Sequence, residues 1–70
     1  MITYEKLWKR MKELGISQYR LHMEGISNST LTRLRRNESV NMETIDKLCK
    51  ILQCNVGDIL DHREDQVEGE

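Results

Sequence analysis

A run of small polar residues and arginines between Ser27 and Asn37 is the part of this 70-residue chain best suited to chemistry. Its residue types repeat at helical spacing, which predicts a helix with two different faces. Leu31 and Leu34 lie on one face. The opposite face carries Asn28, Ser29, Thr32, Arg33 and Arg36. Asparagine and arginine can bond base edges in a fork geometry, and guanidinium groups also bind phosphates, so this face suits a DNA groove.

A shorter helix and a tight turn precede this segment. Ser17 can cap the shorter helix, which runs to about Met23 and offers Leu21 to the core. Gly25 makes the turn, and Ser27 can cap the polar helix, which should end near Asn37. The order of helix, turn and helix predicts a helix-turn-helix motif, whose second helix enters the major groove.

The flanking segments predict three more helices, which together give an all-α, compact five-helix domain. Thr3 can cap the first helix and Gly15 can stop it. Asn41 can cap the fourth helix, and Asn55 with Asp58 has the spacing of a capping box for the short last one. The expected apolar stripes of these three helices are Tyr4, Leu7, Trp8, Met11 and Leu14; Ile45, Leu48, Cys49 and Leu52; and Val56, Ile59 and Leu60.

Length and charge restrict the classes of protein. Seventy residues make one domain, which buries roughly 60% of its unfolded surface and has no room for a deep substrate pocket or a ligand-sensing domain. No apolar run approaches a signal peptide or the roughly 20 residues of a membrane span, so we expect a cytoplasmic protein without membrane contact.

The net charge is −1, yet residues 1–40 hold eight Lys or Arg against four acids. Residues 62–70 form an acidic tail, which we expect to be disordered beyond a domain at 1–61.

Catalytic and metal chemistry find little support in the sequence. No nucleophile motif surrounds any serine, so the chain should not be an enzyme and needs no cofactor. Cys49 and Cys54 are not a CxxC pair, and both histidines, His22 and His62, are distant from them in sequence, which argues against a metal site. On one continuous helix, residues five apart point roughly 140° away from each other. That geometry disfavours a disulfide and favours reduced cysteines that pack.

The blocks SQYRL, GISNSTLTRL, NESV, TIDKLCKILQC and NVGDIL carry a resemblance to a known family. In order and spacing the chain resembles the lambda-repressor-like (Cro-like, XRE) helix-turn-helix regulators, and it is most similar to their minimal single-domain members over about residues 2–62. The resemblance implies a five-helix domain that binds operator DNA, regulates transcription and uses the helix at about 28–36 for recognition. Three departures are His22 in place of a small residue, a Leu21-to-Gly25 stretch one residue shorter than usual, and Asn37 where glycine is frequent.

Carried over position by position, the resemblance assigns two sets of DNA contacts. The positions that read bases, or lie beside those that do, are Asn28, Ser29, Thr32 and Arg33. Those expected at the sugar-phosphate backbone are Gln18, Ser27, Arg35, Arg36 and Asn37. Gln18 should also brace the recognition helix.

Three functions remain open from the sequence. The first is a sequence-specific regulator of double-stranded DNA, expected to be a repressor that needs no small-molecule effector and that could form a homodimer through Val56 or Ile59. The second is a protein-interaction module on the same fold, antitoxin-like or anti-repressor-like, which the pI near 6.1 and the acidic tail favour. The third is RNA binding, which ranks last because aromatic stacking platforms are lacking.

Overall fold

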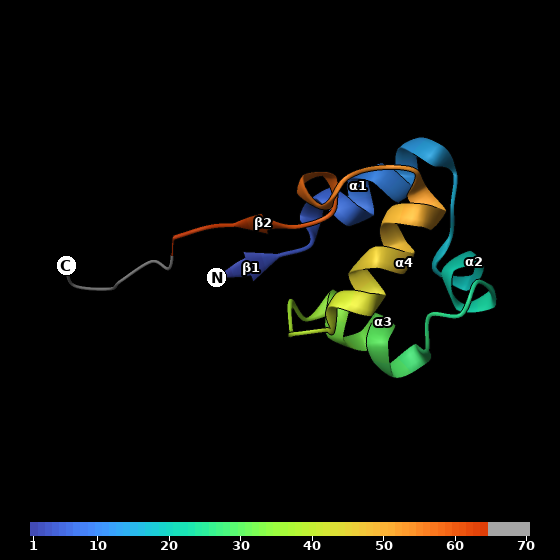
Figure 1. The fold of residues 1–70 in the computed structure, drawn as a ribbon, viewed down its shortest axis with the longest axis horizontal. Helices are drawn as coiled ribbons and strands as arrows, with labels where there is room; N and C mark the ends of the chain where they lie inside the picture. The colour runs from blue at the N-terminus through green and yellow to red at the C-terminus, as the bar shows by residue number, and fades with distance from the viewer. Residues whose placement is uncertain (65–70) are drawn as a thin grey trace.

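The computed structural model describes residues 1–64, which form four α-helices, one 3₁₀ turn and a small sheet. Figure 1 shows α4 extending between α1 and α3, while the two strands leave the helices on one side. The elements are β1 (Ile2–Thr3), α1 (Glu5–Leu14), α2 (Gln18–Met23), α3 (Asn28–Arg35), α4 (Met42–Leu52), η1 (Val56–Asp58) and β2 (Asp61–His62). The all-α prediction is confirmed, although the fifth helix is a single 3₁₀ turn and the strand pair was not foreseen.

Three of the predicted helix caps are confirmed. The side chains of Ser17, Ser27 and Asn41 each accept a hydrogen bond from the backbone N–H three residues later, at 2.8 to 3.2 Å. At η1, the N–H of Asn55 donates to the carboxylate of Asp58 at 3.1 Å, as a capping box requires. Because each cap satisfies a backbone donor that the helix itself cannot, these residues determine where the helices begin.

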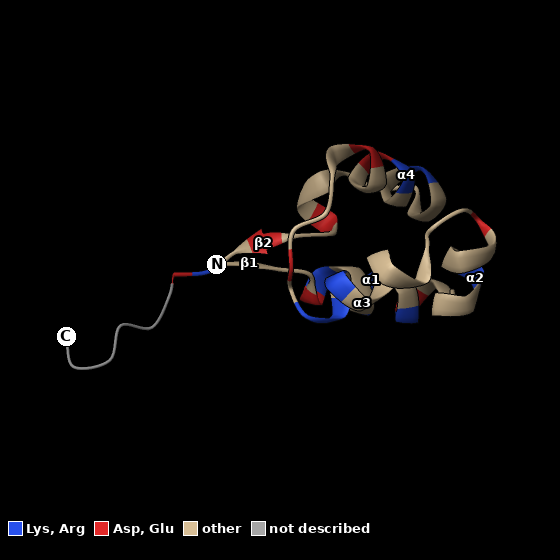
Figure 2. Ribbon diagram, turned by 90° about the horizontal axis from the view of Figure 1, so that it is seen from below, with Lys and Arg blue, Asp and Glu red and all other residues tan. Residues whose placement is uncertain are grey.

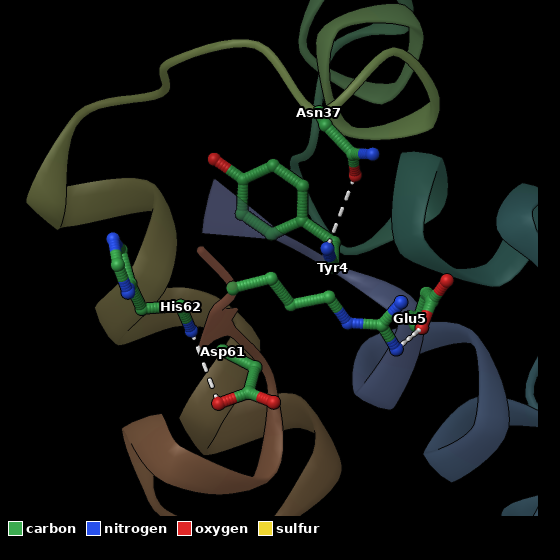
Figure 3. A network of polar contacts seen from close by, with 6 residues as sticks. Tyr4, Glu5, Asn37, Asp61 and His62 are labelled. Carbon is green, nitrogen blue, oxygen red and sulfur yellow. Dashed lines mark hydrogen bonds and ion pairs between the residues drawn. The ribbon is translucent and has the colours of Figure 1, made fainter. Parts of the chain in front are cut away.

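The predicted cap of α1 is wrong. Thr3 pairs with Asp61 in the antiparallel sheet and is buried, and its hydroxyl has no hydrogen-bond partner. Strand pairing holds Thr3 outside the helix, so Tyr4 takes the cap position, and its side chain makes no capping bond to the helix. Instead, the N–H of Tyr4 donates to Oδ1 of Asn37 at 3.1 Å (Figure 3). A residue that follows α3 therefore orders the start of α1.

The core lies where the inner faces of the helices meet. Leu7, Leu34 and Leu48 are fully buried, and Trp8 packs against the core while half-buried. Among residues 1–64, the buried apolar side chains are Tyr4, Leu7, Met11, Leu21, Ile26, Leu31, Leu34, Ile45, Leu48, Leu52 and Ile59. Leu14, predicted to be in this core, is 45% exposed. It ends α1 and lines a surface depression, so part of its side chain faces solvent.

The two ends of the described chain lie side by side. Ile2 pairs with His62 in the sheet, the N–H of Arg63 donates to the carbonyl of Met1 at 2.8 Å, and the Arg63 guanidinium pairs with Glu5 (Figure 3). Residues 62–64, which the sequence assigned to the acidic tail, are thus described next to β1. The remainder of that tail, residues 65–70, lies outside the described residues.

Candidate nucleic-acid interface

The turn between α2 and α3 is held by backbone and side-chain bonds. Gly25 has a φ of 108°, a conformation that residues with a Cβ rarely adopt. The next residue, Ile26, is buried, and its N–H donates to the carbonyl of Leu21 at 3.0 Å. The ring Nδ1 of His22 lies 3.1 Å from the Ile26 carbonyl and donates to it, since a carbonyl oxygen only accepts. These contacts set the angle at which α3 leaves α2.

The rotation of α3 about its axis is as the spacing predicts. Leu31 is 3% exposed and Leu34 is fully buried. Asn28, Ser29 and Arg33 are exposed, and Thr32 is half-buried. The two leucines therefore hold the helix to the core while the polar side chains lie on its outer face.

Two of the expected base readers have no competing partner. Within residues 1–64, the side chains of Asn28 and Arg33 make no hydrogen bond or ion pair. Their donors and acceptors are available to a ligand. Ser29 Oγ lies 3.2 Å from Ser27 Oγ, and Thr32 Oγ1 donates to the carbonyl of Asn28 at 3.0 Å. Thr32 is thus partly committed to its own helix.

A charge-assisted hydrogen bond between side chains connects the two helices of the motif. The guanidinium of Arg35 donates to Oε1 of Gln18 and, at 3.1 Å, to Oγ1 of Thr32. Gln18 is the first residue of α2, and Arg35 is the last of α3. The contact braces α3 against α2, and it leaves the amide nitrogen of Gln18 free to donate to a phosphate.

The other residues expected at the sugar-phosphate backbone differ in how far their side chains are already bonded within the domain. Arg36 lies 4.0 Å from Glu38, and both side chains are more than half exposed, so this pair is weak and leaves the guanidinium accessible. Ser27 Oγ is used in capping α3. Asn37 has a φ of 57°, and its Oδ1 accepts from Tyr4. Ser27 and Asn37 thus have structural roles here, while the Arg36 guanidinium remains accessible to a phosphate. Figure 2 shows the basic residues of α3 toward its C-terminal end.

Comparison with known proteins decides the family. Residues 6–65 match the family model of the Cro/C1-type HTH DNA-binding domain. The chain belongs to this family. A crystal structure of the transcriptional regulator VanUg, in its Form II, is similar to this chain with a TM-score of 0.80. The sequences are 33% identical, and the match covers 86% of this chain and 81% of that one. No curated protein matches.

As a Cro/C1-type domain, the chain carries its polar face on the second helix of the motif, and sequence reasoning missed two residues that support it. Tyr4 was assigned only to the core, yet its hydroxyl also donates to the carbonyl of Glu38 at 2.8 Å, just beyond α3. The sequence marks His22 as a departure from the family pattern and as an unsupported metal ligand, yet its ring bonds the Ile26 carbonyl and closes the turn. The first contact joins residues 34 apart, so no local pattern could reveal it.

Within residues 1–64 of the Cro/C1-type domain, three further observations concern metal, membrane and partner binding. No three His, Cys, Asp or Glu residues are grouped so that they could hold a metal ion. No helix is long and apolar enough to cross a bilayer. Of the two residues suggested for a dimer contact, Ile59 is fully buried and Val56 is 43% exposed. Ile59 therefore belongs to the core. Of these two residues, Val56 is the one whose side chain is exposed to a partner.

Proposed function

We propose that this Cro/C1-type domain is a sequence-specific transcriptional repressor that reads operator DNA with α3 in the major groove. The observation that carries the proposal is the free state of Asn28 and Arg33 on a helix whose leucines are buried. The arginine fork matches guanine O6 and N7, and the asparagine amide matches adenine N6 and N7. The base-reading set is Asn28, Ser29, Thr32 and Arg33.

The phosphate contacts come from residues around this face. Gln18, Arg35 and Arg36 would hold the sugar-phosphate backbone through their amide and guanidinium donors. The N–H groups at the start of α3, after Ser27, would meet a further phosphate. In this arrangement backbone contacts fix the register of the domain, and base contacts select the sequence. We place the activity in the cytoplasm of a bacterium or a phage-infected cell, where occupancy of an operator blocks transcription.

A second copy of the chain completes the proposed repressor. An apolar depression of about 490 Å³ lies beside the end of α3 and is lined by Ile2, Met42 and Val56, which are 41%, 69% and 43% exposed. Pairing of two such faces about a twofold axis would bury these side chains. A dimer of this kind that reads two successive major grooves needs its α3 helices about 34 Å apart, so the operator would be a palindrome.

Selection from a random duplex pool, followed by affinity measurements on the enriched site, tests the proposal. Arg33→Ala should relax preference at particular base pairs, at a cost of about 1–3 kcal/mol. Lys50→Ala is a matched control, because it removes one positive charge from an exposed side chain on α4, away from the reading face. It should leave base preferences unchanged. If no sequence is enriched, or if both variants behave alike, α3 does not read bases.

Salt dependence distinguishes this function from a protein-interaction module on the same fold. A DNA reader loses affinity steeply with salt, because its Lys and Arg displace counterions from phosphates. The pI near 6.1 favours the interaction module, and so would an affinity for DNA that stays weak at low salt.

The dimer is tested separately by sedimentation. Val56→Glu should lower self-association, and Leu14→Glu, at a 45% exposed position on α1, is its control.

A further inference from the structure

The backbone at the end of α4 brings Cys49 and Cys54 close together, although their spacing in the sequence predicts side chains that point apart. The expected separation assumed one continuous helix, but α4 ends at Leu52. Gln53 follows in the left-handed conformation, with φ 51° and ψ 56°. This reverses the chain, and the N–H of Cys54 donates to the carbonyl of Cys49 at 3.1 Å. The pattern is that of a helix end in which the second residue after the helix folds back over its last turn.

This hydrogen bond limits the distance between the two Cα atoms. From the Cα of Cys49 to its carbonyl oxygen is about 2.4 Å, and from the nitrogen of Cys54 to its Cα is about 1.5 Å. With the 3.1 Å hydrogen bond, the straight-line sum is about 7 Å, and the bends at oxygen and nitrogen make the true separation shorter. Disulfides span Cα separations of about 4.4–6.8 Å. The backbone thus places the pair within disulfide range.

Both cysteines are accessible from one surface depression. They are half-buried, free, and line the same hollow of about 470 Å³ together with Arg10, Lys50 and Asp58. The guanidinium of Arg10 donates to the carbonyl of Leu52 at 3.4 Å, and its Nε is buried with no hydrogen-bond partner. A cationic group with an unused donor therefore lies at the end of α4, where the two cysteines meet.

We propose that Cys49 and Cys54 form a dithiol site that closes to an intrachain disulfide by exchange with a low-molecular-weight disulfide. In the first step one protein thiolate attacks the small disulfide, forms a mixed disulfide and releases one small thiolate. In the second step the other protein thiolate attacks the protein-bound sulfur and releases the second small thiol. The small disulfide is reduced to two thiols, and the protein dithiol is oxidised with loss of two hydrogens.

The surroundings of the pair indicate how fast exchange proceeds. Burial raises the pKa of both thiols, and Asp58 raises each further. Both are therefore protonated at neutral pH, and exchange is slow and accelerates with pH. The positive charge of Arg10 acts in the opposite direction on Cys54 and favours its thiolate. Arg10 does not outweigh burial, so the pKa of Cys54 is still raised overall.

The site is separate from the proposed DNA interface. Figure 1 shows the C-terminal end of α4 beside α1, at the end of the helix opposite α3. A disulfide here would fasten the helix end without covering the reading face. We expect oxidation to raise the thermal midpoint of unfolding and to leave DNA affinity unchanged, so the site can be tested whether or not the domain binds DNA.

The test is equilibration of the whole chain with oxidised and reduced glutathione, read by intact mass and thiol counting. The mass of the folded chain should fall by two hydrogens, and both free thiols should disappear from the thiol count. No glutathione adduct and no disulfide-linked dimer should accumulate. The ratio of disulfide to dithiol should be at least about tenfold higher in the folded chain than in concentrated guanidinium chloride, because the fold preorganises the pair. Cys49→Ser and Cys54→Ser should each give only the mixed disulfide. Stable double adducts on the unsubstituted chain, or a ratio no higher than in denaturant, would overturn the proposal.

Discussion

The backbone N–H of Tyr4 and the side-chain oxygen of Asn37 are joined by a 3.1 Å hydrogen bond across 33 residues of chain. Asn37 follows α3 in the left-handed conformation, and the hydroxyl of Tyr4 donates to the carbonyl of the next residue, Glu38. One residue at the start of α1 therefore holds the segment just after α3 in two places. The placement of α3 is therefore coupled to the packing of the N-terminal segment.

Variants at Asn37 separate its two roles. Asn37→Gly keeps the left-handed backbone but loses the bond to Tyr4, which should lower the free energy of unfolding by about 1 kcal/mol. Asn37→Ala loses the bond and adds a left-handed alanine, so the loss should be about 2 kcal/mol. Urea denaturation measures both. A glycine variant as stable as the unsubstituted chain would show that the bond contributes nothing.

Thr3 provides a test in which two interpretations predict opposite signs. As a helix cap, Thr3→Val would cost about 1 kcal/mol. In the structure its hydroxyl is buried without a partner, so replacing it with a methyl group of similar shape should stabilise the domain by about 1 kcal/mol. The change in the denaturation midpoint decides between them. A destabilised Thr3→Val chain would mean that the hydroxyl is hydrogen-bonded.

Local patterns predicted most of the fold because local interactions determine it. The caps at Ser17, Ser27 and Asn41 depend on backbone groups three residues away, and the rotation of α3 follows from the spacing of its leucines. Each of these can be read from a short window. The roles of the outer residues on α3 remain predictions, because they depend on a ligand.

Contacts between distant segments could not be predicted in this way. The strand pair joins residues 2 and 62, and it turned the expected cap at Thr3 into a buried strand residue. The two cysteines illustrate a subtler failure, since helical spacing holds only while the helix continues. Gln53 carries no sequence signal for the left-handed conformation that a glycine would have indicated.

Removing the anchor of α3 should affect the fold before it affects recognition. Leu31 is 3% exposed, so Leu31→Ala should lower the free energy of unfolding by about 2–5 kcal/mol. Calorimetry or urea denaturation measures this loss. Ser29→Ala, at an exposed position on the same helix, is a control that should change stability by less than about 0.5 kcal/mol. Equal stability of the two variants would mean that the helix is rotated differently.

Alkaline pH should destabilise the domain through Tyr4. Burial raises the pKa of its phenol above the ordinary value near 10. As pH rises past 10, the unfolded chain releases this proton while the folded chain retains it. The free energy of unfolding therefore falls, by up to about 1.4 kcal/mol per pH unit, until the folded phenol also ionises. Tyr4→Phe should be less stable at neutral pH but should lack this part of the slope. Parallel stability curves for the two chains between pH 9 and 11 would contradict the assignment.

The contact between Gln18 and Arg35 predicts coupling in DNA binding. Gln18→Ala should weaken binding to all sequences similarly, because a phosphate donor is lost and Arg35 loses its brace. Arg35→Ala should have the same kind of effect. Because the two side chains touch, the double variant should cost less than the sum of the single variants, by at least about 0.5 kcal/mol. Fluorescence anisotropy on one duplex, at one salt concentration, gives the four affinities. Strict additivity would mean that the two residues hold the DNA backbone independently.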